Sequence, residues 1–376
     1  MTLDLTFGGR LRIPLIAAPM FLVSSPEMAL AACSRGVMGS FPAHSTRTRE
    51  VFAGWLDQMT RGMQELRDQG IEPAPYAVNL VVHRTNERYP GDLELCIQHE
   101  VSVILTSKGG PEDVFRQIHD YRGVAFHDIA SRRHAEKALE AGADGLTAVC
   151  GGAGGHCGTL NPFALLNEVR EITDKPIVLA GSLSTGRDIV AALAMAADLA
   201  YMGTRFIPVR ESLASEDYRS ALFGATAKDV LFTTALDGFP ANFLTPSIEA
   251  AGLDLDEVKA TPPGQIVDPG KARTRYKKIF SAGQGVGMVN GVRTTAELCD
   301  ELIAQYEEAR LAVRERLRGA EVVEPATSRV RAKKVSDSGS RPGERPVLGV
   351  DKGQFSVPED FDAPLDKDLL RATRRL

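Results

Sequence analysis

The chain has 376 residues, of which 43% are hydrophobic and 25% are charged, and its formal net charge is −5. This composition is typical of a globular protein with one large domain or two ordinary ones, and the charge gives no reason to expect nucleic acid as a partner. No apolar run approaches the roughly 18 residues that span a bilayer, and residues 1–25 lack the layout of a signal peptide. Five scattered cysteines form no disulfide framework, so we expect a cytoplasmic protein that is not bound to a membrane.

Eight short apolar, β-branched runs recur along the first 206 residues. They cover 15–20, 36–43, 76–82, 101–107, 123–129, 144–152, 176–182 and 199–206. Segments with apolar residues at helical spacing separate them, for example 28–36, 133–143 and 187–197. This alternation predicts an α/β fold with parallel strands, either a (β/α)₈ TIM barrel or an open doubly wound sheet. We favour the barrel because polar and glycine-rich residues follow nearly every strand instead of gathering at one crevice.

The pattern changes after the eighth predicted strand. We interpret 207–280 as a mainly helical lid over the barrel mouth, with an aromatic-bearing loop at 237–247; a surface insertion without a role is the alternative. Four aromatic residues favour the covering role: Phe223, Phe232, Phe239 and Phe243. A glycine-rich stretch then leads into a long amphipathic helix over 295–317. The predicted barrel therefore comprises 1–206 and 281–320.

In a (β/α)₈ barrel the residues that follow the strands line one mouth, where the active site lies. Here the strands end in Pro19-Met20, Asn79, Thr106-Ser107-Lys108, His127-Asp128, Gly151 through His156, Gly181-Ser182 and Gly203-Thr204. The loops after the seventh and eighth strands of barrels often bind phosphate, so their glycine turns indicate a phosphate-bearing cofactor such as FMN. No dinucleotide fingerprint of the G-x-G-x-x-G type opens a helix after a strand.

One histidine, His156, lies in the glycine-rich loop from Gly151 to Gly158. It could act as a general base over a cofactor, because imidazole titrates near neutral pH. It could instead cap the turn, or bind a metal together with Cys150 and Cys157. Since no further carboxylates or thiols complete a set of four ligands, we predict no metal; the base and cap roles both stay open.

The chain up to about Leu317 resembles the nitronate monooxygenases, formerly called 2-nitropropane dioxygenases, which are FMN-dependent (β/α)₈ enzymes. The matching pieces occur in the family's order: PLIAAPM, YAVNLVVHRTN, VILTS, VAFHDIASRRHAEKALEAGADGLTAV, GGAGGH, PIVLAGSLSTGRDIVAALAMAADLAYMGTRF and GQGVG. The resemblance implies that His156 is the catalytic base. It also implies FMN contacts by Met20, Asn79, Gly181, Ser182, Gly203 and Thr204, to which we add Lys108, Gly154 and Gly155 at the same mouth.

The implied reaction is oxidation of nitroalkanes or alkyl nitronates with O₂ to carbonyl compounds and nitrite. A flavin-dependent enoyl-thioester reductase that uses NAD(P)H is an alternative with a similar G-G-H loop, and a flavin-binding protein without this chemistry is another. Three positions depart from the common pattern. Gly152 stands where many relatives have Glu, Ser182 where Gly is usual, and Cys157 where Gly is common. We expect these departures to alter the hydrogen bonds around the loop and the substrate preference.

The composition shifts after about Glu324, and 325–376 forms a separate tail. Within 329–345 there are six Lys or Arg residues against two Asp or Glu, among many Ser, Gly and Pro, which is typical of a flexible linker. The following stretch KGQFSVPEDFDAPLDKDLL resembles the toxin-binding tail of prevent-host-death type antitoxins, which implies a toxin as a partner. A disordered terminus that binds nothing is the alternative.

Overall fold

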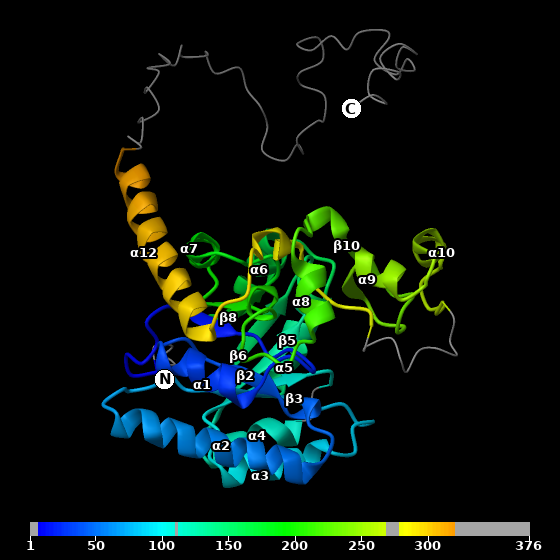
Figure 1. The fold of residues 1–376 in the computed structure, drawn as a ribbon. Helices are drawn as coiled ribbons and strands as arrows, with labels where there is room; N and C mark the ends of the chain where they lie inside the picture. Colours follow the sequence, from blue (N-terminus) through cyan, green and yellow to red (C-terminus); the bar gives the residue numbers. More distant parts are fainter. Residues whose placement is uncertain (1–6, 110–111, 268–277, 320–376) are drawn as a thin grey trace, which may run out of the picture. The chain divides into compact units, whose positions relative to one another are not determined.

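The protein is described here by a computed structural model that covers residues 7–109, 112–267 and 278–319 (Figure 1). The predicted linker and antitoxin-like tail lie outside these described residues, as do the first six residues of the predicted barrel. Within the described part of the chain, no helix is long and apolar enough to cross a membrane.

Eight parallel strands form the centre of the fold (Figure 1). They are β1 (Leu15–Ala17), β2 (Ser40–Pro42), β3 (Ala77–Val81), β4 (Val103–Ser107), β5 (Val124–Ile129), β6 (Gly145–Val149), β8 (Ile177–Ala180) and β9 (Leu199–Met202). Their order is β1-β9-β8-β6-β5-β4-β3-β2, and a parallel bridge between Ile16 and Met38 closes the sheet. The eight predicted strands and the (β/α)₈ barrel are therefore confirmed.

Helices follow the strands and pack around them. They are α1 (Pro26–Ser34), α2 (Arg49–Asp68), α3 (Tyr89–Gln98), α4 (Glu112–Asp120), α5 (Arg132–Glu140), α6 (Pro162–Arg170), α7 (Gly186–Ala194) and α12 (Thr295–Gly319). Side chains that accept hydrogen bonds from the first turn begin several of them, as Thr185 does for α7. The predicted long helix is α12, which packs against α7 and α1.

The interior of the barrel is filled by alternate residues of the strands. Ile16, Met38, Ala77, Val103, Leu105, Phe126, Val178 and Leu199 form one buried cluster. Because side chains alternate between the two faces of a strand, the residue two positions after each of these also faces the interior. Asn79, Asp128 and Tyr201 therefore lie above this cluster, toward the carboxyl ends of the strands.

The segment 207–280 contains helices and a hairpin. The helices are α8 (Glu216–Leu222), α9 (Thr245–Ala250) and α10 (Leu255–Ala260), and the hairpin joins β10 (Val230–Thr233) to β11 (Ala241–Leu244). Strand β11 also pairs antiparallel with β7 (Gly155–His156) in the glycine-rich loop. The predicted loop at 237–247 thus contains a strand. Its partner β7 is distant in the sequence, and local periodicity does not reveal such a pairing.

Candidate active site

The loops after β6, β8 and β9 meet residues 283–285 of the segment that leads to α12. The amide of Gly283 donates to the Thr204 hydroxyl (2.9 Å), and the amide of Gln284 donates to the Gly152 carbonyl (2.9 Å). A Cβ on Gly181 would lie 3.1 Å from the Gly151 carbonyl oxygen. We call this region the glycine junction, and it comprises residues 151–154, 181–182, 203–204 and 283–285.

Two of the three unusual residues in the sequence contact each other at this junction. Gly152 has a φ of +86°, and Ser182 has a φ of +59° although it is not glycine. A Cβ on Gly152 would overlap the Ser182 hydroxyl and would lie 2.8 Å from the Gln284 side-chain oxygen. A glutamate at position 152 would therefore require the Ser182 hydroxyl and the Gln284 side chain to move away, so the two departures are sterically linked.

The junction has features that suit a phosphate group. The amides of Ser182 and Thr204 donate no hydrogen bond to any residue that the structure describes. A Cβ on Gly203 would lie in ordinary contact with Met20 and Ala18, 3.5 Å from the Met20 sulfur and 3.6 Å from the Ala18 Cβ, so a larger side chain there would crowd these neighbours. The N-terminus of α7 is less available, because the Asp188 carboxylate accepts from the amides just before it. Loop amides thus fit an anion better than the helix end does.

His156 lies in a second group of residues, which we call the histidine cluster: His156, Asp237, Phe239 and Lys108. The His156 Nε2 atom is 3.0 Å from an Asp237 carboxylate oxygen, and the ring meets Phe239 edge to face with centroids 5.6 Å apart. The Lys108 ammonium lies 4.3 Å above the Phe239 ring. Burial lowers the pKa of Lys108, while the Asp237 charge opposes this shift. The His156 side chain is 40% exposed, so it remains accessible to a ligand.

The second strand of the hairpin holds the histidine loop in place. The Cys157 amide donates to the Pro240 carbonyl (3.1 Å), and the buried Asn242 side chain donates to the Ala153 carbonyl (2.7 Å) and to the Cys157 sulfur (3.3 Å). Burial raises the pKa of Cys157 to about 11. Among the described residues no group of three or more His, Cys, Asp or Glu side chains could hold a metal ion.

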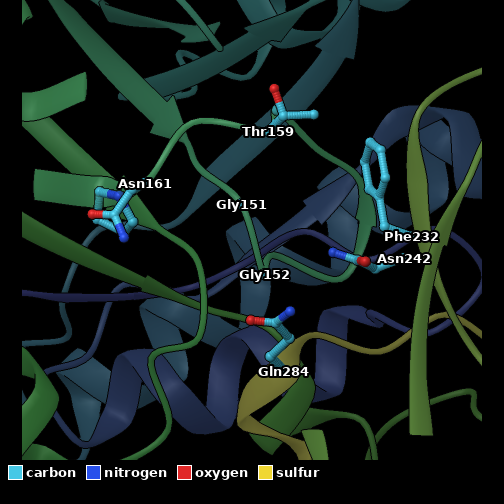
Figure 2. A pocket seen from close by; sticks show the side chains of 9 residues that line it. Gly151, Gly152, Thr159, Asn161, Phe232, Asn242 and Gln284 are labelled. Atoms are coloured by element: carbon cyan, nitrogen blue, oxygen red, sulfur yellow. The ribbon is translucent and has the colours of Figure 1, made fainter. Parts of the chain in front are cut away.

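A cavity of about 330 Å³ lies beside the same loop. Its lining consists of Gly151, Gly152, Gly158, Thr159, Asn161, Pro162, Phe232, Asn242 and Gln284. Figure 2 shows Phe232 and Asn242 together on one side of the loop and Gln284 below Gly152. His156 does not line this cavity, so the loop has the histidine cluster and a polar cavity as separate neighbours.

The strand ends form a floor inside the barrel mouth, made of Asn79, Ser107, Asp128, Val149 and Tyr201. All five are partly exposed, whereas the layer beneath them is buried. The Asn79 amide donates to the Leu105 carbonyl (2.9 Å) and approaches the Ser107 hydroxyl (3.4 Å). We call these residues the barrel floor.

His127, which the strand-end reasoning placed at the mouth, faces away from it. Its Nδ1 atom pairs with the Thr106 hydroxyl (2.8 Å), and its ring packs edge to face on Phe115 of α4. Burial lowers the pKa of His127 to about 4. Neighbouring residues of a strand point to opposite faces, so Asp128 faces the mouth and His127 does not.

The structure therefore distributes the predicted site residues over three adjacent groups. The junction contains Gly154, Gly181, Ser182, Gly203 and Thr204, and Met20 lies against it at Gly203. The histidine cluster contains His156 and Lys108, and the barrel floor contains Asn79. Gly155, in β7, has open space at its Cβ position. The sequence reasoning missed Asp237, Asn242 and Gln284. The GQGVG motif marked Gln284 without assigning it a role, and no local pattern marks the other two.

Comparison with known proteins places the chain in a family. The sequence profile described as nitronate monooxygenase matches residues 84–305. A nitronate monooxygenase of Paraburkholderia phytofirmans is 26% identical over 351 residues, which cover 78% of this chain and 91% of that protein.

Two solved structures share the fold. A nitroalkane oxidase of Streptomyces ansochromogenes has a TM-score of 0.68 at 22% identity, over 82% of this chain and 99% of that one. FabK of Thermotoga maritima has a TM-score of 0.67 at 23% identity, over 84% of this chain and 99% of that one. Since the family profile spans more than half of the sequence, the chain belongs to the nitronate monooxygenase family of oxidoreductases.

Proposed function

We propose that this protein is an FMN-dependent nitronate monooxygenase, which oxidises nitroalkanes or alkyl nitronates with O₂ to carbonyl compounds and nitrite. The observation that carries the proposal is the placement of His156. A carboxylate orients its ring, and it is carried by the same loop that forms one wall of a phosphate-compatible junction. A base and a cofactor phosphate site are thus joined by a few residues of backbone.

Family membership implies a flavin, and the residues of the junction fit FMN. The free amides of Ser182 and Thr204 would hold its phosphate, beside Gly203 and Met20. The isoalloxazine ring would then lie over the barrel floor, close to Asn79. Bound FMN would supply the electron acceptor for the substrate and the place where O₂ reacts.

The contact with Asp237 determines which nitrogen of His156 can accept a proton. When Nε2–H donates to the Asp237 carboxylate, Nδ1 carries the lone pair and acts as the base. The α-carbon of a neutral nitroalkane loses its proton to this nitrogen. The Asp237 charge stabilises the imidazolium that forms, as a buried carboxylate does for other catalytic histidines. A substrate that enters as the nitronate has already lost this proton and does not need His156.

We propose that the segment 207–280 covers the mouth during this chemistry. Asp237 and Phe239 from this segment contact His156, and β11 pairs with the histidine loop. Aromatic cover would limit access of water to the substrate carbon while it is deprotonated. The segment thereby supplies a positioning carboxylate and an apolar wall.

The experiment that tests the proposal compares two ionisation forms of one substrate in His156→Asn. We expect turnover of the neutral nitroalkane to fall by about 10²–10⁴-fold, while turnover of the pre-ionised nitronate changes far less. A histidine that only caps the loop would, on substitution, disturb both forms equally through displaced flavin. Rates are therefore measured at matched flavin content.

His119→Asn is a matched control for this substitution. His119 pairs with the Asp144 carboxylate at 2.9 Å and is 41% exposed, close to the values for His156. Asp144 lies just before β6, at the opposite end of the barrel from the carboxyl ends of the strands. His119→Asn should lower neither turnover rate. If His156→Asn lowered turnover of the neutral nitroalkane and of the nitronate equally, the base assignment would be refuted.

A further inference from the structure

Asp128 is an acidic residue of the barrel floor that the proposed reaction leaves without a role. It follows Phe126 on the interior face of β5 and pairs in register with Thr147 of β6. Its Oδ1 atom is buried and forms no hydrogen bond with any residue that the structure describes, and the same holds for the Thr147 hydroxyl. The residue as a whole is nevertheless partly exposed, which places the carboxyl at the edge of the barrel mouth.

The neighbours of Asp128 do not compensate a negative charge. The interior side chains of the flanking strands are Leu105 and Ser107 on β4 and Thr147 and Val149 on β6, none of which is titratable. Across the barrel, Tyr201 is close enough for Asp128 to raise its pKa further, beyond the effect of burial. The nearby cation Lys108 interacts instead with Phe239 and Asp237.

A carboxyl group in this position favours its neutral form. Burial raises the pKa of Asp128 to about 7; the Thr147 hydroxyl is near enough to oppose the shift, although it makes no well-formed hydrogen bond with the carboxyl. A ring laid across the floor would exclude more water and would favour the neutral acid further. A neutral acid can donate one hydrogen bond, whereas an ionised one only accepts. In the absence of a ligand, a buried polar atom without a partner is a cost to the fold.

We propose that Asp128 is a cofactor-contacting residue whose neutral carboxyl donates a hydrogen bond to the flavin ring from the barrel floor. This inference rests on the proposed FMN site and adds a residue to it on the side away from the phosphate. It follows that ionisation of Asp128 would weaken binding and oppose reduction, because reduction adds electrons to a ring that would then lie beside a negative charge.

The test measures FMN affinity and flavin midpoint potential at pH 6 and pH 8.5 in wild type, Asp128→Asn and Asp128→Ala. We expect Asp128→Ala to bind FMN about five- to tenfold more weakly at pH 6, the effect of one lost hydrogen bond. Asp128→Asn keeps a donor and should stay within about threefold of wild type. Because the FMN phosphate also titrates in this range, wild type is compared with Asp128→Asn at each pH. At pH 8.5 wild type should bind FMN more weakly than Asp128→Asn does, and its flavin midpoint potential should be lower.

Stability of the apoprotein separates this role from a merely structural one. Removal of a buried carboxyl without a partner should leave the thermal midpoint of the apoprotein unchanged or raise it, in both variants. Glu136→Gln is the control for loss of one negative charge, since Glu136 is exposed on α5 and pairs with Arg132 on the outside of the same βα unit. It should change neither FMN affinity nor midpoint potential.

Two results would overturn the inference while leaving the proposed function intact: unchanged FMN affinity and midpoint potential in Asp128→Ala, or an equal loss of affinity in Asp128→Asn and Asp128→Ala at pH 6. Failure of wild-type apoprotein to bind FMN would instead remove the proposed function, and this inference with it.

Discussion

The contact between Gly152 and Ser182 predicts that these two positions are energetically coupled. A Cβ introduced by Gly152→Ala overlaps the Ser182 hydroxyl and lies 2.8 Å from the Gln284 side-chain oxygen. The backbone at Gly152 also has a φ of +86°, which alanine adopts only with strain. The substitution therefore has two separable costs, one conformational and one steric.

The two costs have different expected sizes. A non-glycine residue in the left-handed region costs about 1–2 kcal/mol, and overpacking of a well-packed site costs about 1–3 kcal/mol. Gly152→Ala should thus lower the free energy of unfolding by about 2–5 kcal/mol in total. Ser182→Gly removes the overlapping hydroxyl. By itself it should be nearly neutral, because the relief of strain at its φ of +59° is offset by the entropy of a new glycine.

The assay is urea unfolding of the apoprotein, followed by circular dichroism, for both single variants and the double variant. We expect the steric part, about 1–3 kcal/mol, to be recovered when Gly152→Ala is made in the Ser182→Gly background. Gly155→Ala is the matched control for strain alone, because Gly155 has a φ of +70° and no atom within 4 Å of its Cβ position. An equal cost of Gly152→Ala in both backgrounds would refute the coupling.

Two further substitutions test the cofactor site and the orientation of the base. Gly203→Val should remove most of the FMN, because its Cβ already contacts Met20 and Ala18 and its two further methyl groups must displace them or enter the proposed phosphate site. Flavin content is measured by absorbance against the control Gly54→Ala, which changes a helical glycine with open space around it. Full flavin content in Gly203→Val would contradict the phosphate site. Asp237→Asn should lower turnover of a neutral nitroalkane by about 10–100-fold, because it leaves the imidazolium of His156 uncompensated. Steady-state rates check this, and an equal loss with the pre-ionised nitronate would argue against the positioning role.

The elements that the sequence predicts correctly are those with a local signature. The buried runs of the eight parallel strands alternate with helices of clear periodicity, which predicts parallel βα units, and the polar residues after nearly every strand favour the barrel over an open sheet. The glycines around His156 likewise indicate a constrained loop, and the turn at Gly181 indicates close approach of backbone. These features lie within single short stretches, where residue type and conformation are directly linked.

The missed features depend on contacts between distant parts of the chain. Asp237 reaches His156 only because β11 pairs with β7, and neither two- to four-residue strand has a pattern of its own. The contact of Lys108 with Phe239 likewise joins distant parts of the chain, and the expected contact of Lys108 with the cofactor stays a prediction. The fit of Gly152 to Ser182 is also invisible in a linear pattern, although both residues were recognised as unusual.

The measurement that tests the central claim most directly is the visible spectrum of the flavin-loaded protein during anaerobic titration. We predict that an alkyl nitronate bleaches the flavin bands, that NAD(P)H does not, and that admission of O₂ restores the bands with release of nitrite. Bleaching by NAD(P)H but not by nitronate would instead indicate an enoyl-thioester reductase, and bleaching by neither donor a flavin-binding protein without this chemistry. Either of these results, or a purified protein that binds no flavin, would contradict the proposed function.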